Sequence, residues 1–234
     1  MGKPITSQKR GKGSVTFRSP SFKFKGEVKM LPHKEHALVV DILHCAGHSA
    51  PLAQIYYDDG ETGLVIATEG IAVGDQIDFG ETAEIKFGNV VPLKAIPEGV
   101  SVYNIELRPN DGGKLVRSSG AAAKVVSKGK DGVVLQLPSR KQKKFHPECR
   151  AIIGVAAGGG RVDKPYLKAG TKFYAMKARN KYWPQVSASA MNAVAHPFGN
   201  KRTLRKSKAK PAPKNAPPGR KVGAIRARRT GRKN

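Results

Sequence analysis

The last part of the chain carries positive charge with no negative charge to balance it. From residue 164 to residue 234 there are twenty Lys or Arg and no Asp or Glu. Residues 199–234 alone hold fourteen Lys or Arg, four Pro and no aromatic residue. Such a segment cannot bury enough apolar surface to offset its conformational entropy. We therefore expect it to lack structure on its own and to take one extended path against a folded polyanion.

The whole chain has a similar excess of positive charge. Its 234 residues include 43 Lys or Arg and 17 Asp or Glu, which gives a net charge of +26. A compact body with that excess repels itself unless a polyanion neutralises it. Nucleic acid is the first candidate and an anionic membrane the second, but no apolar run reaches the roughly 18 residues of a membrane span. The N-terminal stretch MGKPITSQKRGKGS also lacks the apolar centre of a secretory signal, so we expect no membrane partner.

The charge is divided unevenly along the chain. Residues 1–26 hold seven basic and no acidic residues, whereas residues 27–110 hold five basic and thirteen acidic ones. Residues 111–163 hold eleven basic and four acidic residues. A protein that needed only a cationic coat would have little reason to keep an acidic module. The division predicts a body with an acidic side that faces solvent, a basic side that docks on the polyanion, and basic arms that enter it.

Short apolar runs separated by turns begin near residue 37. The runs ALVVDILHC, LAQIYY, GLVIA, DQIDFG and AEIKFG are rich in Val, Ile, Tyr and Phe, which favour strands. The sequence Asp58-Asp59-Gly60 between two of them is typical of a hairpin turn. Short strands with regular turns indicate a small barrel or sandwich. We predict an all-β protein with an OB-type barrel over residues 27–110, preceded by an extended basic arm over residues 1–26.

A second series of strands follows the Pro- and Gly-rich seam at residues 97–113. Its runs are AAAKVVSK, GVVLQLP, RAIIGVA and TKFYAMKA, and a tight turn is expected at residues 129–132. We predict a second, basic, small β-barrel over residues 111–190 and a basic tail over residues 191–234. No segment sustains an amphipathic helical period, so we expect no long helix and at most a short helical turn near residues 117–123.

Two basic loops are candidates for phosphate contact. The glycines of GVAAGGGRVDKP, with Arg161 and Lys164 beside them, allow the backbone to approach a phosphate, although a flexible turn would look the same. The loop matches neither a GxxxxGK[ST] nor a GxGxxG nucleotide motif. The run RKQKK at residues 140–144 lies in the basic half, which favours phosphate contact over a merely solvated loop.

Four His and one Cys lie together in residues 31–53. Zinc uses such ligands, but their spacing fits no standard zinc site and a predicted strand separates the two halves of the cluster. We expect no metal bound by the protein alone, and we expect His44 and His48 in a loop at a strand end, in contact with RNA or solvent. Only two Cys occur in the chain, Cys45 and Cys149, which favours a reduced, cytoplasmic setting.

The aromatic residues of the basic parts have two interpretations. Phe17 and its neighbours Phe22 and Phe24 can stack on bases or pack against the protein body, and packing is the commoner fate of an aromatic side chain. The only Trp, Trp183, follows Tyr182. We interpret this pair as packing at a domain edge, with base stacking as the alternative.

His196, in AMNAVAHPFGNKRTLRK, is a candidate catalytic base. A nucleophile–base pair needs a third group to orient the base, and no acid follows Asp163 in the chain. Pro197 and Gly199 favour an extended turn over a rigid site. The residues favour His196 as a positioned RNA contact, and we expect no enzymatic activity.

Several long blocks resemble the universal L-two family of large-subunit ribosomal proteins, in its archaeal form, across nearly the whole chain. The blocks are RGKGSVTFRSPS, HCAGHSAPLA with IYYDDG, IPEGVSVYNIELRPNDGGKLVRSSG, LPSRKQKKFHPECRAIIGVAAGGGRVDKPYLKAG, AMNAVAHP and PPGRKVGAIRARRTGR. The resemblance implies an OB barrel, then a Src-homology-three-like barrel, and arms buried in large-subunit rRNA. It also implies a place in cytoplasmic ribosomes near the peptidyl-transferase centre, with Mg²⁺ associated with the rRNA.

The resemblance further implies roles in subunit association and tRNA placement. It implies contacts with the small subunit, with neighbouring ribosomal proteins and indirectly with tRNA, and no homo-oligomer. A catalytic role has been proposed for the family's histidine, which corresponds to His196, but Ala195 stands where the family has an aspartate. The expected rRNA-binding residues, which combine basic side chains with the glycine loop, two histidines and the family's AMN…HP segment, are Lys9, Arg10, Lys12, Arg18, His44, His48, Arg117, Lys141, Lys143, Lys144, Arg150, Gly159, Gly160, Arg161, Lys164, Met191, Asn192, His196, Pro197, Lys201, Arg202, Arg205, Arg220, Lys221, Arg226, Arg228, Arg229 and Arg232.

A basic DNA-binding chromatin or transcription protein is the alternative function. It would explain the net charge of +26. It would explain neither the acidic first half nor the ordered blocks. Competition between duplex DNA and structured rRNA for the chain distinguishes the two functions.

Overall fold

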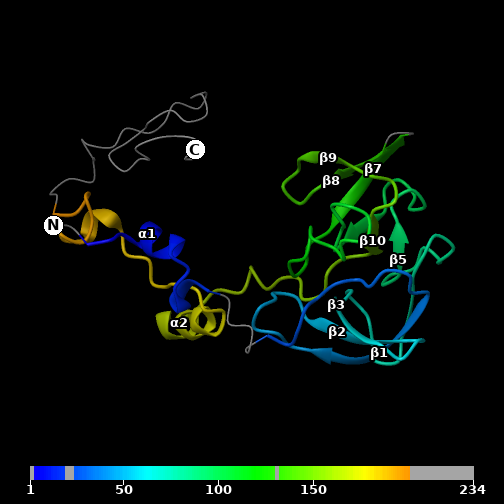
Figure 1. The fold of residues 1–234 in the computed structure, drawn as a ribbon, viewed down its shortest axis with the longest axis horizontal. Coiled ribbons are helices and arrows are strands. Elements are labelled where there is room, and N and C mark those ends of the chain that lie inside the picture. Colours follow the sequence, from blue (N-terminus) through cyan, green and yellow to red (C-terminus); the bar gives the residue numbers. More distant parts are fainter. Residues whose placement is uncertain (1–2, 19–23, 130–131, 201–234) are drawn as a thin grey trace, which may run out of the picture. The chain divides into compact units, whose positions relative to one another are not determined.

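The chain divides into two compact units. The computed structural model describes residues 3–18, 24–129 and 132–200 (Figure 1). The larger unit is Pro20–Thr171, and the smaller unit combines Met1–Ser19 with Lys172–Asn234. All strands of the described residues belong to the larger unit.

The first sheet of the larger unit has four antiparallel strands in the order β3-β2-β1-β4. The strands are β1 (His36–Leu43), β2 (Leu52–Tyr57), β3 (Thr62–Ile66) and β4 (Gln76–Asp78). β2 and β3 form the hairpin expected from the Asp-Asp-Gly turn, in which Gly60 has the positive φ of 86° that glycine adopts readily. The first core lies beneath this sheet, and its members Leu52, Ile55 and Tyr57 have no exposed surface.

The second sheet has six strands in the order β5-β10-β6-β7-β8-β9, all paired antiparallel. They are β5 (Val90–Pro92), β6 (Ser101–Tyr103), β7 (Ala123–Gly129), β8 (Gly132–Gln136), β9 (Gln142–Phe145) and β10 (Arg150–Ile153). β7 and β8 pair along their length as far as Gly129 and Gly132. The two central residues of the expected turn, 130 and 131, lie outside the described residues. Figure 1 shows this sheet in green beside the bluer first sheet. The expected all-β fold class is confirmed.

The two sheets share their cores through β6 and β10. Tyr103 and Ile152 pack in the first core, whereas their neighbours Val102 and Ile153 pack in the second. Successive side chains of a strand point to opposite faces, so one short strand can serve two cores. By strand pairing β5 and β6 belong to the second sheet, so the first sheet ends at residue 78 and the second begins at residue 90. The predicted domain boundary at residue 110 stays a prediction.

A buried ion pair joins three distant segments of the larger unit. The Glu106 side chain has no exposed surface and pairs with Arg150, with Oε1 2.8 Å from Nη2. Its oxygens also accept the backbone N–H groups of Gly112 and Arg150. Arg150 in turn donates to the carbonyl oxygens of Met30 and Leu31. The pair holds residues 30–31, the loop at residues 106–112 and strand β10 together.

Four local predictions were wrong. The run AEIKFG is not a strand, since residues 83–88 form bends and a turn between β4 and β5. The run TKFYAMKA is helical, within α2 (Ala169–Ala178), because Ala, Met and Lys favour helices and its apolar residues lack a strict alternation. The N-terminal arm is not wholly extended: it holds helix α1 (Thr6–Gly11), whose first turn is stabilised because the Ile5 N–H donates to the Gln8 side chain at 2.8 Å, and a 3₁₀ turn at Val15–Phe17. A hydrogen-bonded turn, in which Ala121 N–H donates to the Ser118 carbonyl, replaces the helical turn expected near residues 117–123.

No helix among the described residues has the length and apolar character to cross a membrane. Within the same residues, no three His, Cys, Asp or Glu side chains are grouped closely enough to hold a metal ion.

Candidate nucleic-acid interface

The smaller unit is strongly basic, and its described residues lack a core. Its two segments contain 23 of the 43 Lys and Arg of the chain and none of the 17 acids. Over the described ranges, every buried apolar side chain lies between residues 28 and 156, outside this unit. The apolar burial that stabilises most folded units is therefore lacking in the described part of the smaller unit.

A few polar and aromatic contacts join the two segments of the smaller unit. The Asn180 side-chain amide donates to the carbonyl oxygens of Val15 and Arg18, at 2.7 and 2.5 Å. The ring of Phe17 lies 5.9 Å from that of Tyr182, and the Arg10 guanidinium lies 5.8 Å from the Phe17 ring centre. Phe17 thus packs within the protein, which is one of the two alternatives for it. These contacts fix the N-terminal arm to residues 180–182 and leave Lys9, Lys12 and Arg18 exposed.

Trp183, next to Tyr182, is partly buried. The Lys172 ammonium lies 5.6 Å from its ring centre. The contact is a cation–π interaction within the smaller unit. It agrees with the interpretation of this residue as packed rather than fully exposed.

His196 lies in a closed turn over residues 191–200. Its Nδ1 accepts the Phe198 N–H at 3.1 Å, and its ring lies 5.2 Å from the Phe198 ring. Because Nδ1 is the acceptor, the proton of the neutral imidazole lies on Nε2. The ring lines a cavity of about 270 Å³, together with Arg10, Met191 and other residues of the same unit. Its nitrogen Nε2 is then a hydrogen-bond donor in cationic surroundings, which suits an RNA oxygen.

The turn that holds His196 depends on close backbone packing. The Asn192 carbonyl accepts the N–H groups of Ala195 and His196, and the Asn200 N–H donates to the Met191 carbonyl at 2.8 Å. A Cβ at Gly199 would collide with the carbonyl oxygens of Met191 and Asn192. The residues of the AMN…HP segment are therefore brought together, and Gly199 was not recognised as a position that requires glycine.

Three loops of the larger unit form one polar surface, which we name the three-loop surface: residues 44–49, 118–121 and 158–161. Arg161 Nε donates to the Ser119 hydroxyl at 2.9 Å, and the Ser119 N–H donates to the Ser49 hydroxyl at 3.1 Å. The backbone of Gly159 packs so closely on Gly120 that a Cβ at Gly120 would lie 2.8 Å from the Gly159 Cα. Loops that are far apart in the sequence thus present glycine backbone, hydroxyls and an arginine together.

Two further residues shape the three-loop surface. Arg117 is partly buried and donates to the carbonyl oxygens of Gly113 and Val28, and burial lowers its pKa below the usual value for arginine. Burial, and secondarily the charge of Arg117, lowers the pKa of His48. A neutral His48 therefore offers hydrogen bonds rather than charge at neutral pH. His44, in the same loop, is exposed, as are Gly159, Gly160, Arg161 and Lys164.

The basic run at residues 140–144 lies around β9, at the edge of the second sheet. Lys141, Lys143 and Lys144 are exposed, and the Lys143 ammonium lies 5.2 Å from the Phe145 ring centre. Lysines on an edge strand also discourage pairing with another chain. Their position fits phosphate contact and edge protection equally.

Two of the expected RNA-binding residues are hydrogen-bonded within the protein. Arg117 and Arg150 donate hydrogen bonds to the protein, and the Arg150 side chain is only 12% exposed. Their contact with RNA stays a prediction, as does that of the other residues. The residues of the expected set that lie outside the described part of the chain are Lys201, Arg202, Arg205, Arg220, Lys221, Arg226, Arg228, Arg229 and Arg232.

Sequence reasoning missed the residues that organise these surfaces. Asn180 joins the two segments of the smaller unit, and Ser49 and Ser119 join the loops of the three-loop surface. Their contacts span long stretches of sequence, so no local pattern could indicate them. The shared lack of acids in residues 1–19 and 172–234 was the one available signal that these segments belong together.

Comparison with known proteins gives two family models and several close relatives. The model described as Ribosomal Proteins L2, RNA binding N-terminal domain, matches residues 2–78. The model described as Ribosomal Proteins L2, C-terminal domain, matches residues 86–217. The first match ends at residue 78, where the first sheet ends, and the second begins at residue 86, shortly before the first strand of the second sheet.

The relatives are similar over their whole length. The large ribosomal subunit protein uL2 of Archaeoglobus fulgidus is 50% identical over 99% of both chains. The protein of the same name from Methanococcus vannielii is 50% identical over 100% of both chains. That of Haloarcula marismortui is 48% identical over 99% of this chain and 98% of its own.

Proposed function

Because the chain belongs to the L2 family of ribosomal proteins, we propose that it is a structural component of the large ribosomal subunit that binds rRNA directly. The observation that carries the proposal is the smaller unit, with 23 Lys or Arg and no acid. Its described part has no buried apolar side chain. A unit with such charge is stabilised when a folded polyanion surrounds it.

Binding proceeds through charge and shape. Each Lys or Arg that neutralises a phosphate releases condensed counterions, so the affinity falls steeply as salt rises. Arginine adds bidentate phosphate contacts and stacking on bases. The three-loop surface adds backbone N–H groups and the Ser49 and Ser119 hydroxyls beside Arg161, which suits phosphate and sugar oxygens. Specificity comes from the shape of the folded RNA rather than from base reading.

The segment around His196 positions RNA and carries out no proton transfer. His196 Nδ1 is held by the Phe198 N–H, and the unit that contains it has no Asp or Glu to orient the ring as a general base. In this role the protein supports the architecture of the peptidyl-transferase centre, tRNA placement and association with the small subunit. It works in cytoplasmic ribosomes beside other ribosomal proteins, as a single copy, with Mg²⁺ held by the rRNA rather than by the protein.

A role in binding duplex DNA is not favoured. Residues 27–110 carry thirteen acids against five basic residues, which a coat for DNA would not need. The full-length relatives are named as large-subunit proteins.

Filter binding to large-subunit rRNA tests the proposal, with the full chain and a chain that ends at Ala190. The full chain is expected to lose affinity steeply with salt, by roughly 10³-fold or more between 50 and 200 mM if it makes six or more phosphate contacts. The shortened chain is expected to bind more weakly and with a shallower salt slope. Equal affinity and slope for the two chains would refute the anchoring role of the tail. Displacement of the rRNA by an equal mass of duplex DNA would refute the rRNA preference.

A further inference from the structure

The first sheet is built from a stretch without positive charge. Residues 35–85 contain no Lys or Arg and ten Asp or Glu, in a chain with a net charge of +26. All four strands of the first sheet, β1 to β4, lie within this stretch. A surface with that balance repels phosphate. The outward side of the first sheet is therefore not an RNA-binding surface.

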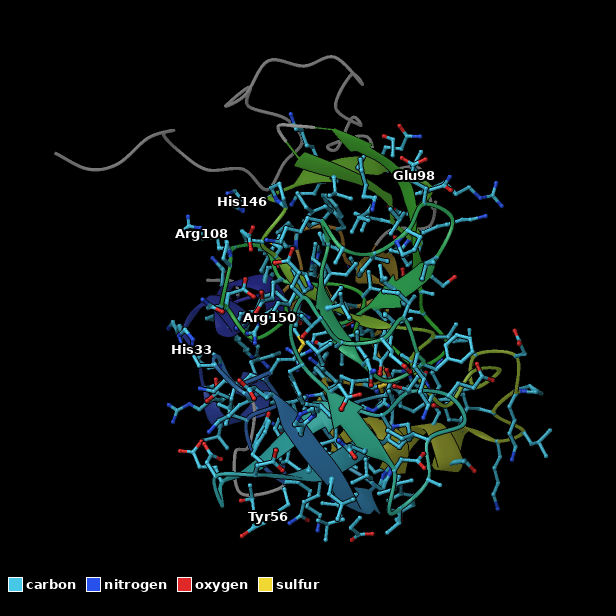
Figure 2. The ribbon with its side chains drawn as sticks, turned by 90° about the vertical axis from the view of Figure 1, so that its right-hand side faces the viewer. His33, Tyr56, Glu98, Arg108, His146 and Arg150 are labelled. Atoms are coloured by element: carbon cyan, nitrogen blue, oxygen red, sulfur yellow. The ribbon has the colours of Figure 1, made fainter. Side chains whose placement is uncertain are left out.

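The same side of the sheet exposes apolar side chains. Leu38 and Val40 of β1 are 49% and 47% exposed, and Tyr56 of β2 is 47% exposed. Leu38 pairs directly with Tyr56 across the two strands, and Figure 2 shows Tyr56 at the outer margin of the protein, beyond the strands of the first sheet. A solvated face of an antiparallel sheet normally carries polar residues at these positions. This face is therefore suited to a partner rather than to water.

A groove continues this face at edge strand β4. Gln76 of β4 pairs with Leu38 and also lines the groove. We name this hollow the acidic groove; its volume is about 270 Å³, and its lining includes two acids, Glu69 and Asp75, one base, Lys86, and the apolar side chains of Ile71, Ile77 and Phe87.

Phe87 forms a firm wall of the acidic groove. It is 75% exposed, yet its ring lies directly over Gly154, where a Cβ would be 3.1 Å from the ring. The next residue, Gly88, donates its N–H to the Ile153 carbonyl at 3.0 Å and so fixes the backbone. On the acidic side, the Asp75 carboxylate accepts the Ala72 N–H at 2.8 Å. The groove is held open by the fold before any partner arrives.

The volume and the charge of the acidic groove limit which kind of ligand it can bind. Pockets for drug-sized molecules have volumes of about 300–1,000 Å³, and this open groove is smaller. It has room for one apolar side chain of a peptide. The exposed carboxylates of Glu69 and Asp75 outnumber the single cation of the lining, Lys86, so the excess negative charge of the groove matches Lys or Arg beside that side chain.

We propose that the acidic groove and the adjoining face of Leu38, Val40 and Tyr56 bind a cationic protein segment. The segment inserts an apolar side chain beside Phe87 and places Lys or Arg against Glu69 and Asp75. The inference rests on the proposed function, because it assigns the partner to another basic protein of the same particle. It adds a protein-binding side, opposite in charge to the surfaces that meet RNA.

Photo-crosslinking in native large subunits tests the inference. A photoreactive phenylalanine analogue replaces Phe87 in one variant and, as a matched control, Val162 in another. Val162 is 81% exposed and follows Arg161 of the three-loop surface. We expect an adduct with a Lys- or Arg-rich protein segment from position 87 and an adduct with rRNA from position 162. An rRNA adduct at position 87, or no adduct there when position 162 reacts, would overturn the inference. Failure at position 162 with a protein adduct at 87 would instead count against the proposed rRNA contacts.

A binding assay with purified full-length protein gives a second test. The probe is a short labelled Lys-rich peptide with one central Leu, compared with the same peptide carrying Ala and with a single-stranded RNA of equal length. The variants Phe87→Ala and Glu69→Lys change exposed residues and should leave the fold intact. Each is expected to weaken binding of the Leu peptide at least fivefold and to leave RNA binding unchanged or stronger. Equal binding of the Leu and Ala peptides, or unchanged binding by both variants, would overturn the inference.

Discussion

The buried pair of Glu106 and Arg150 offers a sharp test of what holds the larger unit together. In the variant Arg150→Met, the Glu106 carboxylate stays fully buried without its charged partner. Loss of one partner of a buried ion pair costs about 3–5 kcal/mol. The carbonyl oxygens of Met30 and Leu31 also lose their donors, at about 1 kcal/mol each. Since the Arg150 side chain is 12% exposed and water can reach it, we expect a total loss of about 4 kcal/mol.

Urea denaturation measures this loss, followed by the near-ultraviolet signal of the buried tyrosines Tyr57 and Tyr103. The control Glu106→Gln keeps an acceptor oxygen for the Gly112 N–H, so it should cost less, about 1–3 kcal/mol. In the double variant the uncompensated charge is gone, and the combined cost should fall below the sum of the single costs. A loss under about 1 kcal/mol for Arg150→Met, or strictly additive effects, would refute the reasoning.

Four further outcomes follow from local features. Gly199→Ala should displace the turn it closes and weaken rRNA binding in a filter assay, with no change in the urea midpoint of the β unit; tight binding by the variant would contradict the packing argument. Burial raises the pKa of Cys149 to about 11, so iodoacetamide at pH 8 should label it, as followed by mass spectrometry, only after unfolding. The bond to Asp78 raises the pKa of His36, so an NMR titration should give a midpoint above about 6.5, and the small stability it adds should be complete below that value and lost as pH rises through the higher midpoint. His196→Gln should leave peptide-bond formation in reconstituted subunits intact, and a loss of that activity with normal assembly would favour a catalytic histidine.

The sequence was most informative where the signal is local. Four of the five apolar runs and the Asp58-Asp59-Gly60 turn predicted the strands and the hairpin of the first sheet, because turn chemistry and strand preference act over a few residues. The fifth run, AEIKFG, forms no strand. The short run TKFYAMKA, residues 171–178, was mistaken for a strand because its apolar residues fit neither period cleanly. The place of β5 and β6 in the second sheet could not be predicted, because β5 pairs with β10 and β6 with β7, which lie far along the chain.

The sequence predicted which segments of the candidate interface are basic, but not how their side chains are arranged. Charge counts alone identified the basic ends and the acidic first module. They could not show that Arg150 is bound inside the protein or that Ser119 joins two loops, because these depend on contacts made only in the folded chain. Leu38 and Tyr56 were predicted only as strand residues. The two-residue alternation of a strand does not show which face of the sheet a partner protein covers.

The pairing of the two chain ends in the smaller unit constrains the order of events during synthesis. The Asn180 amide reaches Val15, across a separation of 165 residues, so this contact must wait until the ribosome has made most of the chain. The larger unit has its cores complete by residue 156 and can fold earlier. In the interval, the cations of the N-terminal segment emerge first and have no partner segment. During this interval, the basic N-terminal segment of a nascent chain can therefore bind any polyanion or acidic protein that it meets first.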